Sequence, residues 1–181
     1  MGTVNERLES FGIKKALDYL NDNPVENAPK VLNWVRKFDK DDYYHNAYDM
    51  IEEALKNPDN NWYKLIMSLY NDIDTGVRKK TFENFLINSS IIGCQRKNKN
   101  EEKYNCNIPW AILMDPTSAC NLHCTGCWAA EYGNKLNMSF ETLDSIIEQG
   151  KKLGTYMYIY SGGEPLVRKD DIIKLCEKHS D

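Results

Sequence analysis

The second part of the chain alternates short apolar runs with amphipathic helical patterns, and no other feature constrains the fold as strongly. In chain order, a run, a helix, a second run and a second helix cover residues 110–114, 139–152, 155–160 and about 170–178. The first run ends at Asp115-Pro116 and is typical of a strand buried on both faces. Ser139 is the expected N-cap of the first helix, and Gly154 ends it. This order predicts an α/β fold whose parallel strands are joined by right-handed crossovers.

The preceding residues contain helical patterns without strand alternation. Apolar stripes at helical spacing lie over residues 8–20, 31–38, 43–55, 62–70 and 77–92, and Asn, Asp, Pro or Gly separates them. We therefore predict a helical bundle over residues 1–92, in which the Trp and Tyr residues of the stripes belong to the core. Residues 93–107 are polar and read as a linker or exposed loop, and the α/β region follows over residues 108–181. Because two parallel strands cannot close a barrel, we expect this sequence to be the front portion of a longer protein.

Composition excludes several classes of function. No apolar run approaches the roughly 18 residues of a membrane-spanning helix, and no secretory signal precedes the first helical pattern, so we expect a cytoplasmic protein with no membrane partner. The formal net charge of −4 argues against binding nucleic acid through a broadly basic surface. In that compartment, six cysteines indicate metal or thiol chemistry rather than disulfides.

Three of these cysteines share the connection between the first strand and its helix. This connection covers residues 116–138, whereas such connections usually take about two to six residues. Inside it, Cys120, Cys124 and Cys127 have the spacing C-x3-C-x2-C. Three thiolates can surround an iron cluster, but they supply one ligand fewer than the four cysteines of an ordinary [4Fe-4S] site. One iron would remain open to a small molecule.

A second motif follows the second predicted strand. Gly162, Gly163, Glu164 and Pro165 stand where that strand ends. The glycines can adopt positive φ and let a ligand approach the backbone, and Pro165 biases Glu164 toward an extended conformation. Because both motifs follow parallel strands, they are expected at the same edge of the sheet, where α/β barrels place their sites.

Together, the cysteine triplet and the GGEP sequence resemble the signature of the radical S-adenosylmethionine (radical SAM) superfamily. The resemblance covers about residues 108–181 and implies a partial (β/α)6 TIM-like barrel, of which this chain has the first two strand-helix units. It also implies that Cys120, Cys124 and Cys127 hold three irons of a [4Fe-4S] cluster while S-adenosylmethionine chelates the fourth. Gly162, Gly163 and Glu164 would contact the methionine amino group of that cofactor.

The activity implied by the resemblance is reductive cleavage of S-adenosylmethionine to a 5′-deoxyadenosyl radical, which abstracts hydrogen from a substrate. A small molecule or a peptide would be the substrate, with a role in peptide or cofactor maturation, and flavodoxin or ferredoxin would be the electron donor. No catalytic residue beyond the cofactor ligands follows from the motifs.

The chain departs from the family pattern at one position. Many members carry an aromatic residue just before the third cysteine, where it contacts the adenine, whereas this chain has Gly126 there and Trp128 just after Cys127. Three roles remain open for Trp128: packing on the adenine, shielding the cluster from water, or a purely structural role.

Two other interpretations of the triplet are retained. A zinc site would need a fourth ligand, and His123 is the nearest candidate, although its neighbour Cys124 is a ligand in the same site. An iron-sulfur module for electron transfer or structure would use the same cysteines without cleaving a cofactor. The radical SAM interpretation differs from both in leaving one iron without a protein ligand.

Overall fold

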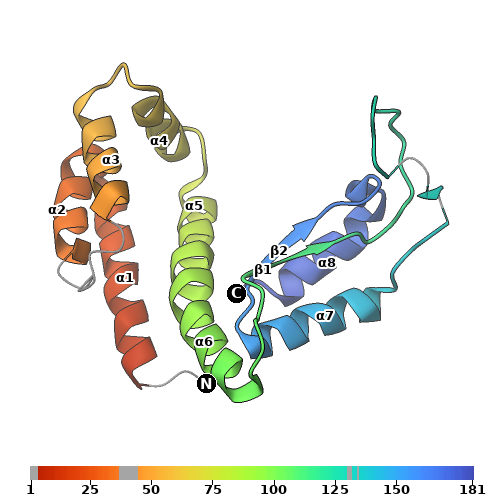
Figure 1. The fold of residues 1–181 in the computed structure, drawn as a ribbon. Helices are drawn as coiled ribbons and strands as arrows, with labels where there is room; N and C mark the ends of the chain where they lie inside the picture. Colours follow the sequence, from red (N-terminus) through yellow and green to blue (C-terminus); the bar gives the residue numbers. More distant parts are fainter. Residues whose placement is uncertain (1–3, 37–44, 130–131, 134) are drawn as a thin grey trace. The chain divides into compact units, whose positions relative to one another are not determined.

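The computed structural model describes residues 4–36, 45–129, 132–133 and 135–181. The chain forms two compact units, Met1–Glu83 and Asn84–Asp181 (Figure 1). The beginning of the predicted helix at Tyr43, and Phe38 of the preceding stripe, lie outside the described residues.

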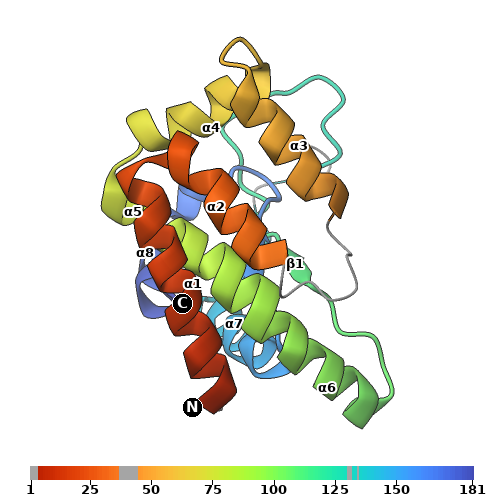
Figure 2. The same ribbon diagram turned by 90° about the vertical axis from the view of Figure 1, so that its left-hand side faces the viewer.

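The first unit is helical, as the stripes predict. Its helices are α1 (Val4–Asp22), α2 (Pro24–Arg36), α3 (His45–Lys56), α4 (Asn61–Asn71) and α5 (Thr75–Phe82). Helices α1 and α2 lie side by side (Figure 2). Asp74 accepts from the backbone N–H groups of Gly76 and Val77, so it caps α5 at the position where sequence punctuation predicted a helix boundary.

A buried arginine, Arg78, organises this unit. Its guanidinium donates to the carbonyl oxygens of Leu69 (3.1 Å), Tyr70 (2.7 Å) and Ile73 (3.2 Å), and to Asn21 Oδ1 of α1 (2.9 Å). Leu69 and Tyr70 belong to the last turn of α4, whose carbonyls have no partner within the helix. Arg78 therefore satisfies the end of one helix while it binds another.

The expectation that stripe aromatics form the core holds for only some of them. Tyr48 is buried, but Trp62 is 59% exposed and Trp34 38% exposed. Short helices in a small unit have much surface for little interior, so some apolar positions remain in contact with solvent.

The second unit begins with helical turns and continues with the alternating elements. These are η1 (Glu83–Gly93, a π-helix that begins one residue before the unit), α6 (Cys94–Tyr104), β1 (Ala111–Met114), α7 (Phe140–Leu153), β2 (Met157–Tyr160), η3 (Pro165–Arg168, a 3-10 turn) and α8 (Lys169–Lys178). Strand, helix, strand and helix follow in the predicted order. Ser139 caps α7 by accepting from the Thr142 N–H, and Gly154 ends it at φ 112°.

The prediction of a loop or linker over residues 93–107 is wrong for most of that segment, because Cys94–Tyr104 is helix α6. Its polar side chains bind the end of α7. Arg96 donates to the Lys151 carbonyl (3.0 Å), and Asn100 donates to the carbonyls of Lys152 (3.2 Å) and Leu153 (3.1 Å). A segment that reads as a solvated linker thus caps a helix of its own unit, and the boundary between units lies earlier, after Glu83.

The sheet consists of β1 and β2 in parallel, with Ala111 opposite Met157 and Met114 opposite Tyr160. One face packs against the helices: its core is Met114, Leu143, Ile147 and Leu175, with Ile112, Tyr158 and Tyr160 around it. On the other face Leu113 is 61% and Ile159 44% exposed. The prediction that the first strand is buried on both faces is therefore wrong, because α7 and α8 both contribute to the same side.

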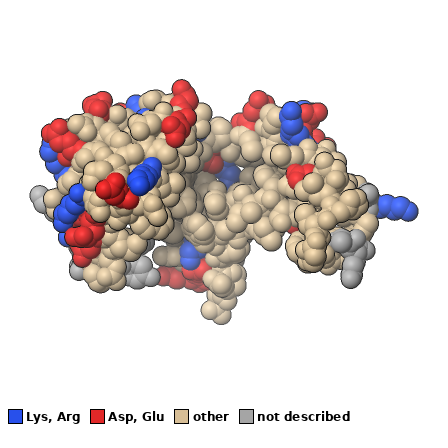
Figure 3. All heavy atoms as spheres, turned by 90° about the horizontal axis from the view of Figure 1, so that it is seen from above, with Lys and Arg blue, Asp and Glu red and all other residues tan. Residues whose placement is uncertain are grey.

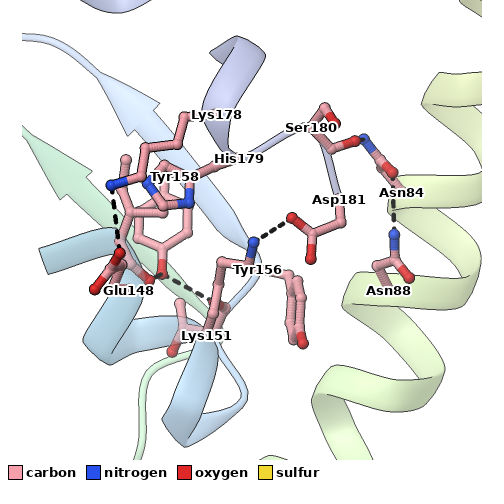
Figure 4. A network of polar contacts seen from close by, with 12 residues as sticks. Asn84, Asn88, Glu148, Lys151, Tyr156, Tyr158, Lys178, His179, Ser180 and Asp181 are labelled. Carbon is pink, nitrogen blue, oxygen red and sulfur yellow. Dashed lines mark hydrogen bonds and ion pairs between the residues drawn. The ribbon is translucent and has the colours of Figure 1, made fainter. Parts of the chain in front are cut away.

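Polar contacts secure the end of α8 within this unit (Figure 4). Lys178 Nζ lies 2.6 Å from Asp144 Oδ2 and His179 Nε2 2.8 Å from Asp144 Oδ1, while Lys151 pairs with Asp181. Asn84 Nδ2 donates to the Ser180 carbonyl at 3.2 Å. These contacts tie α8 to α7 and to η1.

Among the helices described, none is both long and apolar enough to cross a membrane. On the face drawn in Figure 3, acidic and basic side chains are interspersed on the surface. That nucleic acid and membranes are not partners stays a prediction.

Candidate functional site

The long connection between β1 and α7, residues 116–138, is called the cysteine loop below. Its two ends pair as a short antiparallel bridge between Thr117 and Asn137. The Ser118 N–H donates to the Leu136 carbonyl (2.8 Å), and the Met138 N–H donates to the Pro116 carbonyl (3.0 Å). Thr117 Oγ1 lies 2.6 Å from Asn137 Oδ1. The loop therefore leaves the sheet from a closed base.

Cys120 follows the base closely, two residues after Ser118, whereas Cys124 and Cys127 lie further along the loop. Cys120 and Cys127 are partly buried and Cys124 is exposed. The Leu122 N–H donates to Cys120 Sγ at 3.4 Å. The Cys127 N–H donates to the Cys124 carbonyl at 3.2 Å, which closes a tight turn with Gly126 at φ 73°. A positive φ at this position favours glycine, so the turn accounts for Gly126 where the family pattern has an aromatic residue.

The structure does not gather the three thiols into a ligand set. Within the part of the chain that it describes, no three side chains of His, Cys, Asp or Glu are grouped closely enough to hold a metal ion. His123, the candidate zinc ligand, is exposed. The ligand roles of Cys120, Cys124 and Cys127 stay predictions.

Residues 162–165, called the GGEP segment, follow β2 and lie against the start of the cysteine loop. The Gly163 N–H donates to the Thr117 carbonyl (3.0 Å), and the Glu164 N–H donates to the Ala119 carbonyl (2.8 Å). Ala119 immediately precedes Cys120. The two motifs are thus in direct backbone contact at the carboxyl ends of the two strands (Figure 1).

The two glycines of this segment permit a close approach between chain segments. Positive φ was considered for both glycines, and Gly162 adopts it at φ 100°, whereas Gly163 does not. A Cβ on Gly163 would lie 2.3 Å from the Ala119 carbonyl oxygen, and one on Gly162 would lie 2.8 Å from that of Thr117. What approaches the glycine backbone here is the beginning of the cysteine loop.

Glu164 is extended, at φ −103° and ψ 104°, as predicted for a residue before proline. Its Oε1 accepts from the Leu166 N–H at 2.9 Å and caps η3. A hollow of about 340 Å³ lies between this segment and the cysteine loop, and its lining residues are Asn121, Leu122, Glu164, Leu166 and Val167. Both charged and apolar groups therefore face a space of small-molecule size beside the first cysteine.

Trp128 is 59% exposed and meets the ring of Tyr132 edge to face, with the ring centroids 6.0 Å apart. Its position within the loop leaves the three predicted roles open. The contact with Tyr132 is an additional feature that the motifs do not specify.

Sequence reasoning missed Arg168, at the end of η3. Its Nη1 donates to the carbonyls of Pro116 (3.1 Å) and Met138, the two ends of the cysteine loop. Its Nε donates to Asp171 Oδ2 at 3.0 Å, and its side chain is only 16% exposed. The available signal was an arginine three residues after the end of the GGEP segment and three residues before an acidic residue in the first turn of a helix.

Residues 114–181 match the sequence model of the radical SAM superfamily. Over 68 aligned residues the chain is 35% identical to an uncharacterized protein of Archaeoglobus fulgidus. The match covers 35% of this chain and 16% of the relative. No solved structure matches the chain significantly.

This match over residues 114–181 supports the prediction, made from the two motifs, of a radical SAM superfamily member. The matched residues run from Met114, the last residue of β1, to Asp181, just beyond α8, and include both the cysteine loop and the GGEP segment. The helical first unit lies outside them.

Proposed function

We propose that this chain provides the cofactor-binding start of a radical SAM enzyme, with Cys120, Cys124 and Cys127 as ligands of a [4Fe-4S] cluster. The observation that carries the proposal is the pair of hydrogen bonds from Gly163 and Glu164 to Thr117 and Ala119. These bonds bring the GGEP segment to within one residue of Cys120. In a chain whose matched region belongs to this superfamily, that contact supports a single site made from both motifs.

The donor set fits an iron-sulfur cluster in its chemistry. Three thiols on one loop are soft ligands that suit iron, and they leave one position for a ligand from outside the protein. The Leu122 N–H already donates to Cys120 Sγ at 3.4 Å, so this sulfur is held at the start of the loop. The hollow beside Glu164 would accept the S-adenosylmethionine, with Gly162, Gly163, Glu164 and Pro165 as its neighbours and Trp128 on the loop.

When bound and reduced, the cluster would supply the electron that cleaves the sulfonium carbon-sulfur bond of S-adenosylmethionine, giving a 5′-deoxyadenosyl radical that takes hydrogen from the substrate. The residues of this chain would supply three ligands of the cluster, orient the S-adenosylmethionine and restrict the access of water to it. A small molecule or peptide as substrate, and flavodoxin or ferredoxin as electron donor, complete the proposal.

The proposed architecture is a partial (β/α)6 barrel that begins with β1 and β2. It is supported by the exposed face of the sheet, where Leu113 and Ile159 are the kind of side chain that the interior of a barrel buries. The chain spans 16% of the relative that it matches, so the remaining strands are part of the proposal.

The test is anaerobic reconstitution of the full chain with iron and sulfide, followed by metal and sulfide analysis. The proposal predicts a [4Fe-4S] cluster whose electron paramagnetic resonance signal, after reduction by dithionite, changes when S-adenosylmethionine is added. A cluster with an unchanged signal would instead indicate an electron-transfer or structural module. Zinc at one ion per chain, without iron, would contradict both.

A further inference from the structure

We propose that Arg168, held by Asp171, is a positioning residue that closes the base of the cysteine loop and thereby sets the geometry of the predicted iron ligands. This inference deepens the proposed function and rests on it for the ligand role of the cysteines. The closure of the loop itself can be tested without any metal.

The geometry of the guanidinium supports a clamp. Pro116 and Met138 lie at the two ends of a 116–138 connection, yet both of their carbonyl oxygens accept from the same nitrogen, Nη1. The same two ends are also joined by the Met138 N–H, which donates to the Pro116 carbonyl beside the short bridge at Thr117 and Asn137. One side chain from a third segment therefore fixes both ends.

Asp171 fixes the clamp in turn. Its Oδ2 accepts from Nε at 3.0 Å and from Nη2 at 2.5 Å, so the carboxylate holds one edge of the guanidinium plane while Nη1 serves the carbonyls. Arginine presents donors in a rigid planar fork, and a lysine ammonium does not. The pair is largely shielded from water, with 16% of the Arg168 side chain and 29% of the Asp171 side chain exposed.

The clamp acts on the same few residues as the GGEP segment. Gly163 and Glu164 donate to the carbonyls of Thr117 and Ala119, and Arg168 donates to that of Pro116. The segment from Gly163 to Arg168 thus binds three of the four residues that precede Cys120. Because these hydrogen bonds all go to main-chain carbonyls just before Cys120, we infer that they position Cys120 relative to the sheet.

Hydrogen-deuterium exchange on the metal-free full chain tests the closure. In Arg168→Met, we expect about tenfold faster exchange in peptides covering 116–119 and 136–138, where the Ser118 and Met138 amides lose protection, with no change across α7. Arg168→Lys keeps the charge but not the fork and should show most of the same loss. Equal acceleration throughout the second unit, or none at the base of the loop in either variant, would overturn the proposal.

The matched control is Arg96→Met. Arg96 also donates to a main-chain carbonyl, that of Lys151, and to the Tyr156 hydroxyl, but at the other end of α7. Its loss should accelerate exchange near residues 151–156 and leave 116–119 unchanged. If Arg96→Met opened the base of the loop as much as Arg168→Met does, no special role of Arg168 would remain.

Iron release from the reconstituted protein tests the positioning role. Iron should pass to an excess of chelator about tenfold faster from Arg168→Met and Asp171→Asn than from the unaltered chain, and at an unchanged rate from Arg96→Met. Unchanged release from all variants would refute the effect on the ligands. If the unaltered chain binds no iron, the proposed function fails and with it the ligand role, whereas the exchange result still decides whether the clamp exists.

Discussion

Arg78 in the helical unit and Arg168 in the α/β unit each donate to several main-chain carbonyls, but they hold different things together. Arg78 binds oxygens at and just beyond the end of α4 and an asparagine of α1, so it completes the packing of regular elements. Arg168 binds the two ends of an irregular loop and is itself held by a carboxylate. The same residue type therefore joins two helices in one unit and the two ends of a loop in the other, so we expect its loss to have different effects in the two units.

Among the variants that test this contrast, those of the cysteines should have the largest effect, on the amount of iron bound by the α/β unit. Cys124→Ala removes one of three predicted ligands, so the iron retained after anaerobic reconstitution and desalting should fall to near the level of the Cys120→Ala/Cys124→Ala/Cys127→Ala variant. Cys106→Ala is the matched control, because Cys106 is also exposed but lies outside the loop. Equal iron in Cys124→Ala and in the unaltered chain would contradict the ligand role.

Replacing the arginine of the helical unit should mainly lower stability. Arg78→Met leaves the carbonyls of Leu69, Tyr70 and Ile73 without their donor, and we expect the free energy of unfolding of that unit to fall by about 3 kcal/mol. Urea denaturation followed by circular dichroism measures this change. Lys79→Met is the control: it breaks only the exposed pair with Asp18 and should change stability little.

Arg78→Met should leave the retention of iron by the α/β unit unchanged. Faster iron release in Arg78→Met would show that the two arginines do not have separate roles.

Two glycines near the cysteines separate close packing from backbone conformation. Gly163→Ala places a Cβ 2.3 Å from the Ala119 carbonyl oxygen, so the GGEP segment and the loop must move apart, at about 2 to 3 kcal/mol. In Gly126→Ala the new Cβ has no atom within 4 Å, so the only destabilisation is the backbone strain of an alanine at φ 73°, about 1 kcal/mol. Thermal unfolding of the α/β unit gives both values, and a larger loss for Gly126→Ala would contradict the observed contacts.

The smallest effect concerns pH. Burial against α7 and α8 raises the pKa of Tyr160 to about 12 and also raises that of Tyr158. Because the folded pKa exceeds the ordinary value of 10, the stabilising contribution of neutral Tyr160 is complete below pH 10 and is lost as pH rises toward 12. Tyr160→Phe, which keeps the ring, should flatten the decline of stability of the α/β unit over that range in denaturation curves. An unchanged decline would assign the alkaline loss to other groups.

Most regular elements of both units could be predicted from sequence because their signals are local. The cap at Ser139, the end at Gly154 and the apolar face of α7 each depend on residues within a few turns. The order of strands and helices then dictated a parallel pair. The linker or loop predicted over residues 93–107 is wrong where α6 forms, because the partners of Arg96 and Asn100 lie more than fifty residues away.

For the candidate site, the sequence predicted the two motifs but not the contacts between them. Spacing indicated that the cysteines and the GGEP sequence belong to one edge of the sheet, but not that their backbones touch or that the glycines permit that contact. Arg168 and Asp171 gave only a weak signal, since the carbonyls that accept from Arg168 carry no side-chain information. Contacts between a side chain and distant main-chain atoms are the part of a site that residue types do not encode directly.

The closed base at Thr117 and Asn137 has a further consequence for how such a loop can vary. The entropic free-energy cost of closing a loop between two fixed ends grows only slowly with the number of residues in the loop, by about 0.6 kcal/mol for each doubling. Insertions or deletions distal to the bridge would therefore change the spacing of the distal residues while the attachment to β1 and α7 stays the same. The fold can accommodate different loop lengths at this position without rebuilding its sheet.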